Sequence, residues 1–453
     1  MTKPAAGRVL RSKACSDTIC AIATPPGVGS IAVVRITGPD TFRILDRVFR
    51  GPRPSRQAAN TCRTGWVHDG DSVVDQVVLT AFRAPRSYTG EEMAEVSCHG
   101  GGVAASAVLG LLCRSGCRTA RPGEFTRRAV LNRKLSLSQA EAVLDLVQAQ
   151  TPLAYRSALR RYQGGSATGT AGLVEELGEL LALVEHHIGF DEEGAPWPDG
   201  FAAAHRRLLR RLDSAVRGAE RGRYLSEGAR VAIIGRPNVG KSTLFNRLLG
   251  EERAVVTTVP GTTRDRIDAT ATIGGIPVLF TDTGGMTTRP GRVISRRTAQ
   301  QTREAVARAD LVLAVFDRSQ AVRPGDDRVA AVNDSICVLN KSDLGRRFPA
   351  GFLNGRTRAC VELSARTGEN VTGLKRLLTR RLRPGADAPF SGARQSEALS
   401  ESRSAVLRSS QAQDAETSAF ELHAALGALG RIDPAAADSD ILDRVFARFC
   451  VGK

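Results

Sequence analysis

The spacing of hydrophobic positions changes along the chain, and each change predicts a different kind of structure. From residue 18 to about 116, short apolar runs alternate with turns, which predicts β-strands at 19–23, 31–36, 73–82 and 93–98. The small, apolar segment 103–112 predicts a helix packed on that sheet, and the Pro- and Arg-rich residues 51–60 predict a loop. We therefore expect an α+β domain over residues 1–130.

After residue 125, apolar residues recur at helical spacing, which predicts helices within 129–147, 153–162, 173–188 and 201–224. An acidic and Pro-containing break at 191–198 separates two groups of these helices. We assign residues 131–227 to the first part of a helical domain.

Strands and helices then alternate over residues 228–384, which predicts an α/β domain. Helix returns from 391 onward, so residues 385–453 form the second helical part; its apolar stripe Leu442, Val445, Phe446 and Phe449 is expected to be core. The helices on the two sides of the α/β segment are expected to lie together as one bundle interrupted by an inserted domain.

One stretch of the α/β segment has the pattern of a phosphate-binding loop. Gly235–Ser242 follows the apolar run 231–234 and precedes the amphipathic run 243–249. In this strand, glycine loop and helix order, backbone N–H groups and the helix dipole face phosphate oxygens. Lys241 would reach the terminal phosphates, and the Ser242 hydroxyl would ligate Mg²⁺. The alternative is a glycine turn that fits the pattern by chance.

Four further motifs follow in the order that a guanine-nucleotide switch requires. Gly261–Asp265 offers a threonine that could complete the Mg²⁺ shell, and the next strand ends in Asp282, which can hold that shell. After another strand, Asp343 could accept both N–H donors of the guanine edge, a contact that adenine cannot reproduce. Ser364–Arg366 is placed to support the base.

The ordered motifs predict that the chain binds GTP and GDP, with Mg²⁺ on Ser242 and Thr263. The nucleotide contacts predicted from these motifs are Asn238, Val239, Gly240, Lys241, Ser242, Thr243, Gly261, Thr262, Thr263, Asp282, Thr283, Gly284, Gly285, Asn340, Lys341, Ser342, Asp343, Ser364, Ala365 and Arg366.

Charge adds an expectation about partners. The 453 residues carry 64 Lys and Arg against 47 Asp and Glu, a net charge of +17, which favours polyanionic partners or else serves solubility. The predicted helix 201–224 carries clustered arginines that either face nucleic acid or form a solvated face. These arginines are Arg206, Arg207, Arg210, Arg211, Arg217 and Arg221.

The nine cysteines are scattered and odd in number, which argues against a disulfide framework, and Cys113 and Cys117 lack a second pair at zinc spacing. We find no apolar run long enough to span a bilayer and no secretory signal, so a soluble cytoplasmic protein is expected. By spacing alone, the polar residues beside glycine turns are surface residues or caps: Arg35, Glu91, Glu95 and His99.

Short signatures outside the nucleotide motifs add a resemblance. They are Ala23–Gly27, Tyr88–Glu92, Cys98–Gly101, Arg121–Thr126, Leu131–Lys134, Gln139–Ala142 and the ending Phe449–Lys453. From about residue 16 onward, the chain resembles the MnmE (TrmE) family of tRNA modification GTPases, within the TrmE-Era-EngA-YihA-Septin-like superfamily. These signatures are more specific than the GTPase motifs, which many families share.

The resemblance implies a multidomain fold: an N-terminal α+β folate-binding domain that dimerises, a discontinuous helical domain and an inserted P-loop GTPase domain. It implies a homodimer that joins the FAD-dependent protein MnmG in a heterotetramer. Together they would add an aminomethyl-type group, such as carboxymethylaminomethyl, to C5 of the tRNA wobble uridine.

By motif match, the resemblance implies that 5-formyltetrahydrofolate, or a related folate, contacts Arg35, Glu95, Lys134 and Lys453. Cys450 lies beside that site in the family, as a functional thiol or equally as a buried structural cysteine. A K⁺ ion would replace an arginine finger. The matching K⁺ residues are Asn238, Thr257, the Val259 carbonyl and Thr262. By the same match, the resemblance implies that Thr257, Thr258, Val259 and Pro260 also contact the nucleotide.

One departure from the family pattern concerns hydrolysis. Family members carry an acidic switch segment whose glutamate orients the attacking water, whereas here no Asp or Glu occurs between Asp282 and Glu304. No catalytic residue is therefore assigned, and weak intrinsic hydrolysis with intact nucleotide binding is predicted. Two alternatives stay open: an RNA-binding ribosome-assembly GTPase, and a hydrolysis-impaired scaffold for MnmG.

Overall fold

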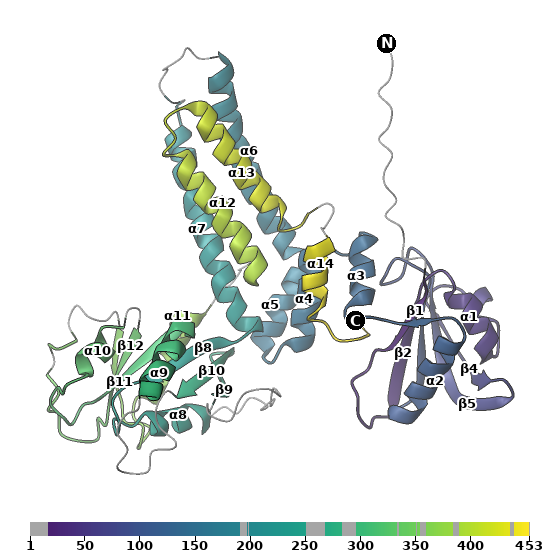
Figure 1. Ribbon diagram of the computed structural model, residues 1–453, viewed down its shortest axis with the longest axis horizontal. Helices are drawn as coiled ribbons and strands as arrows, with labels where there is room; N and C mark the ends of the chain where they lie inside the picture. The colour runs from purple at the N-terminus through teal and green to yellow at the C-terminus, as the bar shows by residue number, and fades with distance from the viewer. Residues whose placement is uncertain are drawn as a thin grey trace. The chain divides into compact units, whose positions relative to one another are not determined.

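The computed structural model describes residues 17–190, 197, 199–250, 268–282, 296–332, 335–349, 351–353, 359–383, 389–434 and 439–452 (Figure 1). The chain divides into two compact units. The first unit comprises Met1–Leu144 and Asp433–Lys453, and the second comprises Asp145–Ile432. The bounds of the four segments predicted from the sequence, 1–130, 131–227, 228–384 and 385–453, stay predictions.

A seven-stranded sheet forms the body of the described part of the first unit, in the order β3-β4-β5-β6-β2-β1-β7. Helices α1 (Thr41–Val48) and α2 (Gly102–Arg114) pack on one face, over a core that includes Val34, Leu79 and Val96. The strands are β1 (Ile19–Ile22), β2 (Ile31–Thr37), β3 (Phe49–Arg50), β4 (Thr61–Asp69), β5 (Ser72–Phe82), β6 (Met93–His99) and β7 (Arg118–Thr119).

The structure confirms the four predicted strands of this domain and the helix that covers them. It adds two longer elements that the pattern did not predict, α1 and β4. Strand β4 has few apolar side chains because most of its residues face solvent, so its period-2 signal is weak. Helix α1 spans only two turns, which is too short for a clear helical period.

The C-terminal residues belong to this first unit. Helix α14 (Ser439–Phe446) packs against α3 (Glu124–Leu131), and the buried Phe446 and Phe449 cover Gly123. Gly123 has a φ of +67°, and a Cβ atom there would lie 2.9 Å from each phenylalanine. The predicted apolar stripe of this helix is therefore core, and only glycine permits the close approach.

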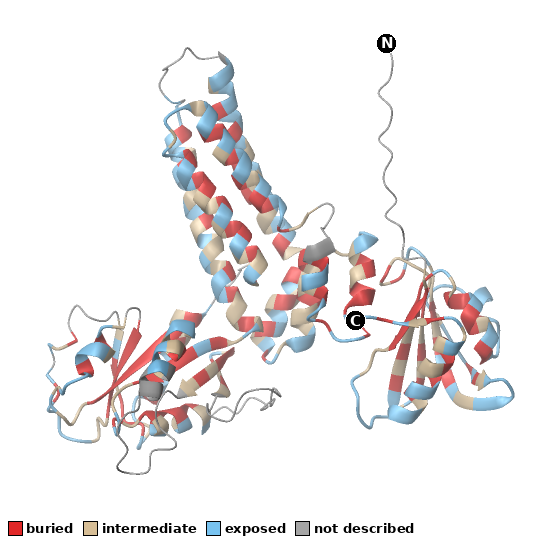
Figure 2. Ribbon diagram, viewed as in Figure 1, coloured by how far each residue is buried: buried red, intermediate tan, exposed pale blue. Residues whose placement is uncertain are grey.

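Four long helices of the second unit form a bundle: α6 (Gly165–Phe190), α7 (Phe201–Ser226), α12 (Ala393–Ser409) and α13 (Ala415–Gly430). Helix α12 packs against α7 and α13, and α13 packs against α6 (Figure 1). Their apolar stripes meet along the bundle axis (Figure 2), where Leu177, Leu208 and Leu399 are buried. Helices from both sides of the α/β segment thus share one core, which confirms the expected discontinuous bundle. Two further helices precede the bundle in the sequence, α4 (Leu137–Gln148) and α5 (Pro152–Tyr162).

The α/β segment is built on a six-stranded sheet, as far as the described residues show, in the order β13-β12-β11-β8-β10-β9. All neighbours are parallel except the β9–β10 pair. The strands are β8 (Ala229–Ile234), β9 (Asp268–Ile273), β10 (Ile276–Asp282), β11 (Leu311–Asp317), β12 (Ser335–Asn340) and β13 (Ala359–Glu362). Strands β11 and β12 are buried along their whole length, as expected of parallel strands covered on both faces.

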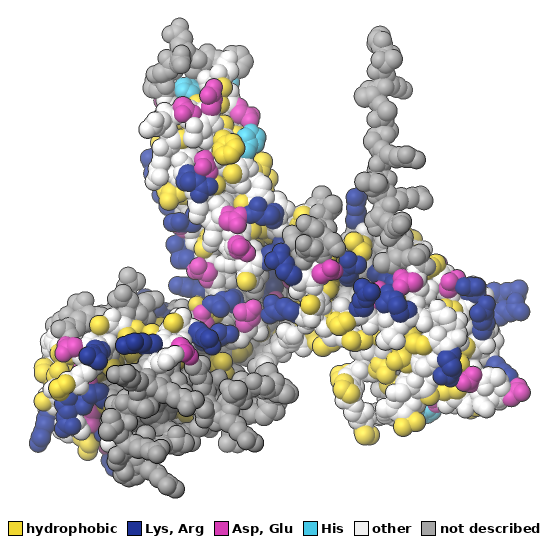
Figure 3. All heavy atoms as spheres, in the orientation of Figure 1, with side chains coloured by type: hydrophobic (Ala, Val, Ile, Leu, Met, Phe, Trp, Pro, Cys, Tyr) yellow, Lys and Arg dark blue, Asp and Glu magenta, His cyan; other side chains and the backbone are white. Residues whose placement is uncertain are grey.

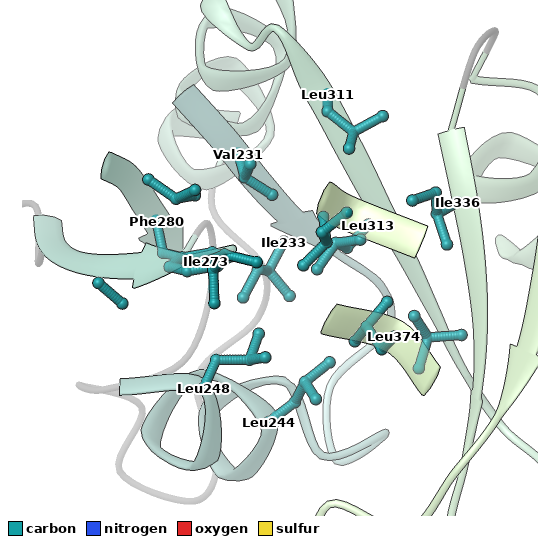
Figure 4. Close-up of a cluster of buried hydrophobic side chains, with 14 of the residues drawn as sticks. Val231, Ile233, Leu244, Leu248, Ile273, Phe280, Leu311, Leu313, Ile336 and Leu374 are labelled. Atoms are coloured by element: carbon teal, nitrogen blue, oxygen red, sulfur yellow. The ribbon is translucent and has the colours of Figure 1, made fainter. Parts of the chain in front are cut away.

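Helices cover both faces of this sheet. Helices α8 (Lys241–Gly250) and α11 (Val371–Leu382) pack on one face, where Leu244 and Leu374 meet Ile233 and Leu313 (Figure 4). The opposite face packs against α9 (Arg296–Arg308) and α10 (Asp326–Ala330). This layering fixes the carboxyl ends of β8, β12 and β13 along one edge of the sheet, where ligands bind in such folds.

Candidate nucleotide-binding site

The loop after β8 has the backbone that a P-loop requires. Gly240 has a φ of +95°, and a Cβ atom there would lie 2.2 Å from the Asn340 side-chain nitrogen. Asn238 adopts a φ of +65°, a left-handed conformation that asparagine tolerates better than most residues. Helix α8 begins at Lys241, so Ser242 and Thr243 lie in its first turn. The loop and the helix N-terminus therefore present backbone N–H groups together.

Lys241 lies against this loop with only 6% of its surface exposed. Its Nζ donates hydrogen bonds of 2.9 Å to the carbonyl oxygens of Gly235 and Arg236. These bonds hold the ammonium at the loop, where a phosphate group would gain a charge-assisted contact.

Asn340 joins the P-loop to the two loops that would hold a base. Its Nδ2 donates a 2.8 Å hydrogen bond to the Val239 carbonyl oxygen, and its Oδ1 accepts a 2.9 Å bond from the Ala365 backbone N–H. The side chain is 2% exposed, and both of its polar ends are bonded. The Asn340 side chain therefore holds the P-loop and the loop after β13 together, although these segments lie far apart in sequence.

Lys341 contacts the P-loop and also Asp317, a residue at the end of β11 that lies outside the sequence motifs. Its Nζ lies 2.9 Å from the Asn238 carbonyl oxygen and 2.6 Å from Asp317 Oδ2. Burial opposes ionisation of Asp317, but hydrogen bonds from Lys341 and Ser319 outweigh it and lower its pKa. Sequence reasoning missed Asp317, although its place at the end of the apolar strand Leu311–Asp317 was a usable signal.

The candidate base-recognition residue Asp343 stands beside the loop that follows β13. A hydrogen bond from Ser364 lowers the pKa of the Asp343 carboxyl group, and Arg366 adds an ion pair of 2.7 Å. Arg247 of α8 donates to the Ala365 carbonyl oxygen at 3.2 Å, and Glu369 accepts a 2.7 Å bond from Ser342. The loop is thus bonded on both sides, and the ionised Asp343 carboxylate can accept hydrogen bonds from N–H donors. Arg247 and Glu369 are supporting residues outside the motifs.

The structure brings together the P-loop, Asn340–Asp343 and Ser364–Arg366. Asp282 ends β10 opposite Ile233 of β8, which places its backbone next to the start of the P-loop. Other predicted contacts lie outside the described residues: Thr257, Thr258, Val259, Pro260, Gly261, Thr262, Thr263, Thr283, Gly284 and Gly285.

The first unit carries a second cluster of predicted residues. Arg35 of β2 faces Glu95 of β6 in register, and its Nη2 lies 2.8 Å from the Glu95 carboxylate. Its Nη1 donates a 3.3 Å bond to the Gly452 carbonyl oxygen, and the guanidinium lies 5.6 Å from the Tyr88 ring centre. The side chain of Lys134 lies beside Gly90. Lys453 is outside the described residues.

The C-terminal tail is held against this cluster by backbone contacts. A Cβ atom at Gly452, whose φ is +98°, would lie 2.4 Å from the Ile22 carbonyl oxygen. The Gly123 N–H donates a 3.3 Å bond to the Cys450 carbonyl oxygen. The Cys450 side chain is exposed, and all eight cysteines in the described ranges have free thiols. The tail thus lies against the polar side chains of β2 and β6 and belongs to the same polar cluster.

His99 and Glu91 take other positions. The His99 ring nitrogen Nδ1 lies 2.6 Å from Asp75 at the exposed end of β6. Glu91 accepts a 3.1 Å bond from Arg128, a buried arginine that also pairs with Asp17 and Glu124. The described residues hold no group of three or more His, Cys, Asp or Glu side chains that could bind a metal ion. None of the helices in the described ranges is long and apolar enough to cross a membrane.

Comparison with known proteins agrees with this architecture. The model for the N-terminus of the GTP-binding protein TrmE matches residues 18–134, and the model for the MnmE helical domain matches residues 137–450. The tRNA modification GTPase MnmE of Moorella thermoacetica is 39% identical, covering 96% of this chain and 99% of that protein.

Two further relatives carry the same name. The protein of Chloroflexus aurantiacus is 38% identical over 97% of this chain and its own whole length. That of Thermotoga maritima is 34% identical over 96% of this chain and 100% of its own. The matches run through both units, so the chain belongs to the MnmE family of tRNA modification GTPases.

Proposed function

We propose that this chain binds GTP and acts with MnmG on C5 of the tRNA wobble uridine, adding a carboxymethylaminomethyl-type group from a folate one-carbon donor. The observation that carries the proposal is the bridge made by Asn340, which connects a phosphate loop to the loops around Asp343. This bridge supports a guanine nucleotide site, and family membership supports tRNA as the substrate.

Each residue of the nucleotide site has a distinct task. Lys241 and the P-loop N–H groups bind the phosphates, and Asp343 selects guanine over adenine. Asn340 and Lys341 hold the P-loop and the base loop in a fixed relation. A site held in this way loses little freedom when the nucleotide binds.

The residues at the phosphate end fit a magnesium ion. Ser242, in the first turn of α8, and Asp282, at the end of the neighbouring β10, are hard oxygen donors on adjacent elements. Thr263 would complete the set. Such an ion neutralises charge on the phosphates. The family resemblance adds K⁺ on Asn238, Thr257, Val259 and Thr262, of which Asn238 lies in the P-loop with a left-handed backbone.

The cluster around Arg35 fits a folate. Arg35 and Lys134 suit the carboxylates of a glutamate tail, and Glu95 suits the pterin N–H edge. Lys453, which directly follows the docked Gly452, would join them. We propose that this unit forms the homodimer and binds the one-carbon donor. We also propose that the homodimer and MnmG form a heterotetramer in the cytoplasm.

The switch segment modifies one part of this proposal. Because no acidic residue occurs between Asp282 and Glu304, no side chain is available there to orient the attacking water as a carboxylate would. We therefore expect slow intrinsic hydrolysis with intact nucleotide binding. Turnover in K⁺ comparable to that of a relative with an acidic switch would contradict slow hydrolysis. Equal turnover in K⁺ and Na⁺ would favour the scaffold alternative.

Wobble-uridine analysis of tRNA tests the function itself. Cells that lack this chain should lose the C5 modification, and the wild-type gene should restore it. An Asp343→Asn gene should not restore it, because GTP binding would be lost. Unmodified wobble positions in the parent strain, or modification that persists in the deleted strain, would contradict the proposal. The ribosome-assembly alternative predicts instead an accumulation of ribosomal precursors with normal tRNA.

A further inference from the structure

The arginines of α7 fall into two classes. Arg207 lies 3.6 Å from Glu179, and Arg211 pairs with Glu176. Arg223, near the C-terminal end of α7, pairs with Asp310. The remaining four have no ion-pair or hydrogen-bond partner among the described residues, and they are Arg206, Arg210, Arg217 and Arg221. Salt bridges thus account for three of the seven arginine charges of α7 and leave four exposed to solvent.

The four unpaired arginines form one stripe. Their spacings of four, seven and four residues place them within an arc of about 60° on a helix with 3.6 residues per turn. The buried positions Leu208, Leu212 and Ala219 lie on the opposite side of α7. The stripe is about 22 Å long at 1.5 Å per residue. Figure 3 shows Lys and Arg side chains along the edge of the bundle where α7 lies.

Acidic residues do little to neutralise this stripe. Asp213 lies on the same side of the helix, but Arg403 of α12 pairs with it. Glu220 is the remaining acidic residue of α7 in this region. The stripe therefore keeps a net charge of about +3 on one solvated face, which is far from the alternating signs of an ordinary exposed helix.

A groove lies beside the second half of the stripe. It has a volume of about 460 Å³, and Arg211, Arg217 and Arg221 are among its lining residues. The buried side chains of Leu173 and Phe390 also line it. The backbone at residues 389–391 comes so close to the helices that a Cβ atom at Gly222 would lie 2.5 Å from the Phe390 carbonyl oxygen. A groove of this size has room for part of a nucleotide between cationic walls.

We propose that this α7 stripe and its groove bind the sugar-phosphate backbone of RNA. Planar guanidinium groups bind phosphate oxygens through paired N–H donors, and they lose little hydration when they do so. A row of cations spaced one or two helical turns apart suits a polymer that carries a charge at each step better than it suits an isolated anion. The proposal rests on tRNA being the substrate, and it assigns a contact surface for it outside the nucleotide site.

The test measures the affinity of the full chain for a tRNA transcript as the KCl concentration varies. Each arginine–phosphate contact contributes about 0.7–0.9 to the slope of log K against log salt. The R217Q/R221Q variant should therefore have a slope smaller by about 1.6. Its loss of affinity between 50 and 200 mM KCl should be about tenfold smaller than that of the wild type.

A matched control removes the same charge from paired positions of the same bundle. The R207Q/R408Q variant loses Arg207 and Arg408, which pair with Glu179 and Glu421. Its salt slope should stay close to that of the wild type. GDP affinity should be unchanged in both variants, which shows that each remains folded.

Three results would overturn the inference. Equal slopes for the two double variants would show that only net charge matters. Displacement of tRNA by polyglutamate at equal charge concentration would identify an acidic polypeptide as the occupant. Failure of the wild-type chain to bind tRNA would disprove the RNA contact at α7. The wobble-uridine and GDP measurements test the proposed function separately.

Discussion

The side chain of Asn340 donates a 2.8 Å hydrogen bond to the carbonyl oxygen of Val239. The two residues are 101 positions apart, and the bond is fully buried. Because Val239 belongs to the P-loop and Asn340 directly precedes Lys341–Asp343, the bond connects phosphate binding to base recognition. Several predictions about the nucleotide site depend on this connection.

Replacing Asn340 with alanine should weaken GDP binding about 10- to 100-fold. The substitution leaves the Val239 carbonyl and the Ala365 N–H without a buried partner, at a cost of about 1–3 kcal/mol. Titration calorimetry with GDP measures the effect, and Gln76→Ala on an exposed strand of the first unit is the control. An Asn340→Ala chain that binds GDP like the wild type would show that the bridge has no role in the site.

A methyl group at Gly240 should damage the same bridge from the other side. The new Cβ would lie 2.2 Å from Asn340 Nδ2, and the φ of +95° disfavours any side chain. We expect Gly240→Ala to lower both GDP affinity and the thermal midpoint of the second unit. The matched control is Gly250→Ala, where a Cβ meets nothing within 4 Å. If the two variants have equal GDP affinity, close packing at Gly240 is not required.

The sequence predicted some residues of the nucleotide site and missed others. The P-loop, Asp343 and Ser364–Arg366 carry local patterns, so their positions at strand ends followed from the order of motifs. Asp317 ends an apolar strand, which was a usable signal, but its partner Lys341 is set by tertiary structure alone. Long-range ion pairs of this kind leave no period or spacing in the sequence.

The arginines of α7 illustrate a different limit. The sequence showed six arginines on the polar side of one helix, but it could not separate those that pair with α6 from those that face solvent. In the first unit, likewise, the pairing of Arg35 with Glu95 depends on the register of β2 and β6. Sequence spacing alone suggested only surface residues there, and the family resemblance supplied the ligand.

The buried ion pairs of Glu124 predict how acid affects the first unit. Burial opposes ionisation of Glu124, but hydrogen bonds from Arg118 and the Arg121 N–H outweigh it and lower its pKa below 4.5. The lowered pKa means that the folded state binds the proton less tightly than the unfolded state. The stabilisation is therefore present above about pH 4.5 and is lost as the pH falls through the lowered pKa.

Glu124→Gln should remove this acid sensitivity and lower the free energy of unfolding at pH 7 by about 1–3 kcal/mol. Trp66 of β4 can report unfolding of the first unit by urea in a Trp197→Phe background, because the chain has two tryptophans. The control is Asp71→Asn, whose carboxylate is fully exposed. A wild-type stability that does not change between pH 6 and pH 3.5 would contradict this account.

Gly452→Ala should weaken binding of 5-formyltetrahydrofolate without affecting GDP. Its Cβ would lie 2.4 Å from the Ile22 carbonyl oxygen, so the tail would have to leave Arg35 and carry Lys453 away. Gly102→Ala, where a Cβ meets nothing within 4 Å, is the control in the same unit. Fluorescence titration with the folate measures the change. Unchanged folate affinity in Gly452→Ala would exclude the docked tail from the site.

The most direct test of the central claim is a competition measurement with labelled GDP. If Asp343 reads guanine in a site held together by Asn340, GTP should displace the label and ATP should require about 10⁴-fold more, since adenine leaves the carboxylate unpaired. In Asp343→Asn, GTP should lose this advantage and xanthosine triphosphate should gain it. Displacement by ATP and GTP at equal concentrations from the wild-type chain would contradict the account.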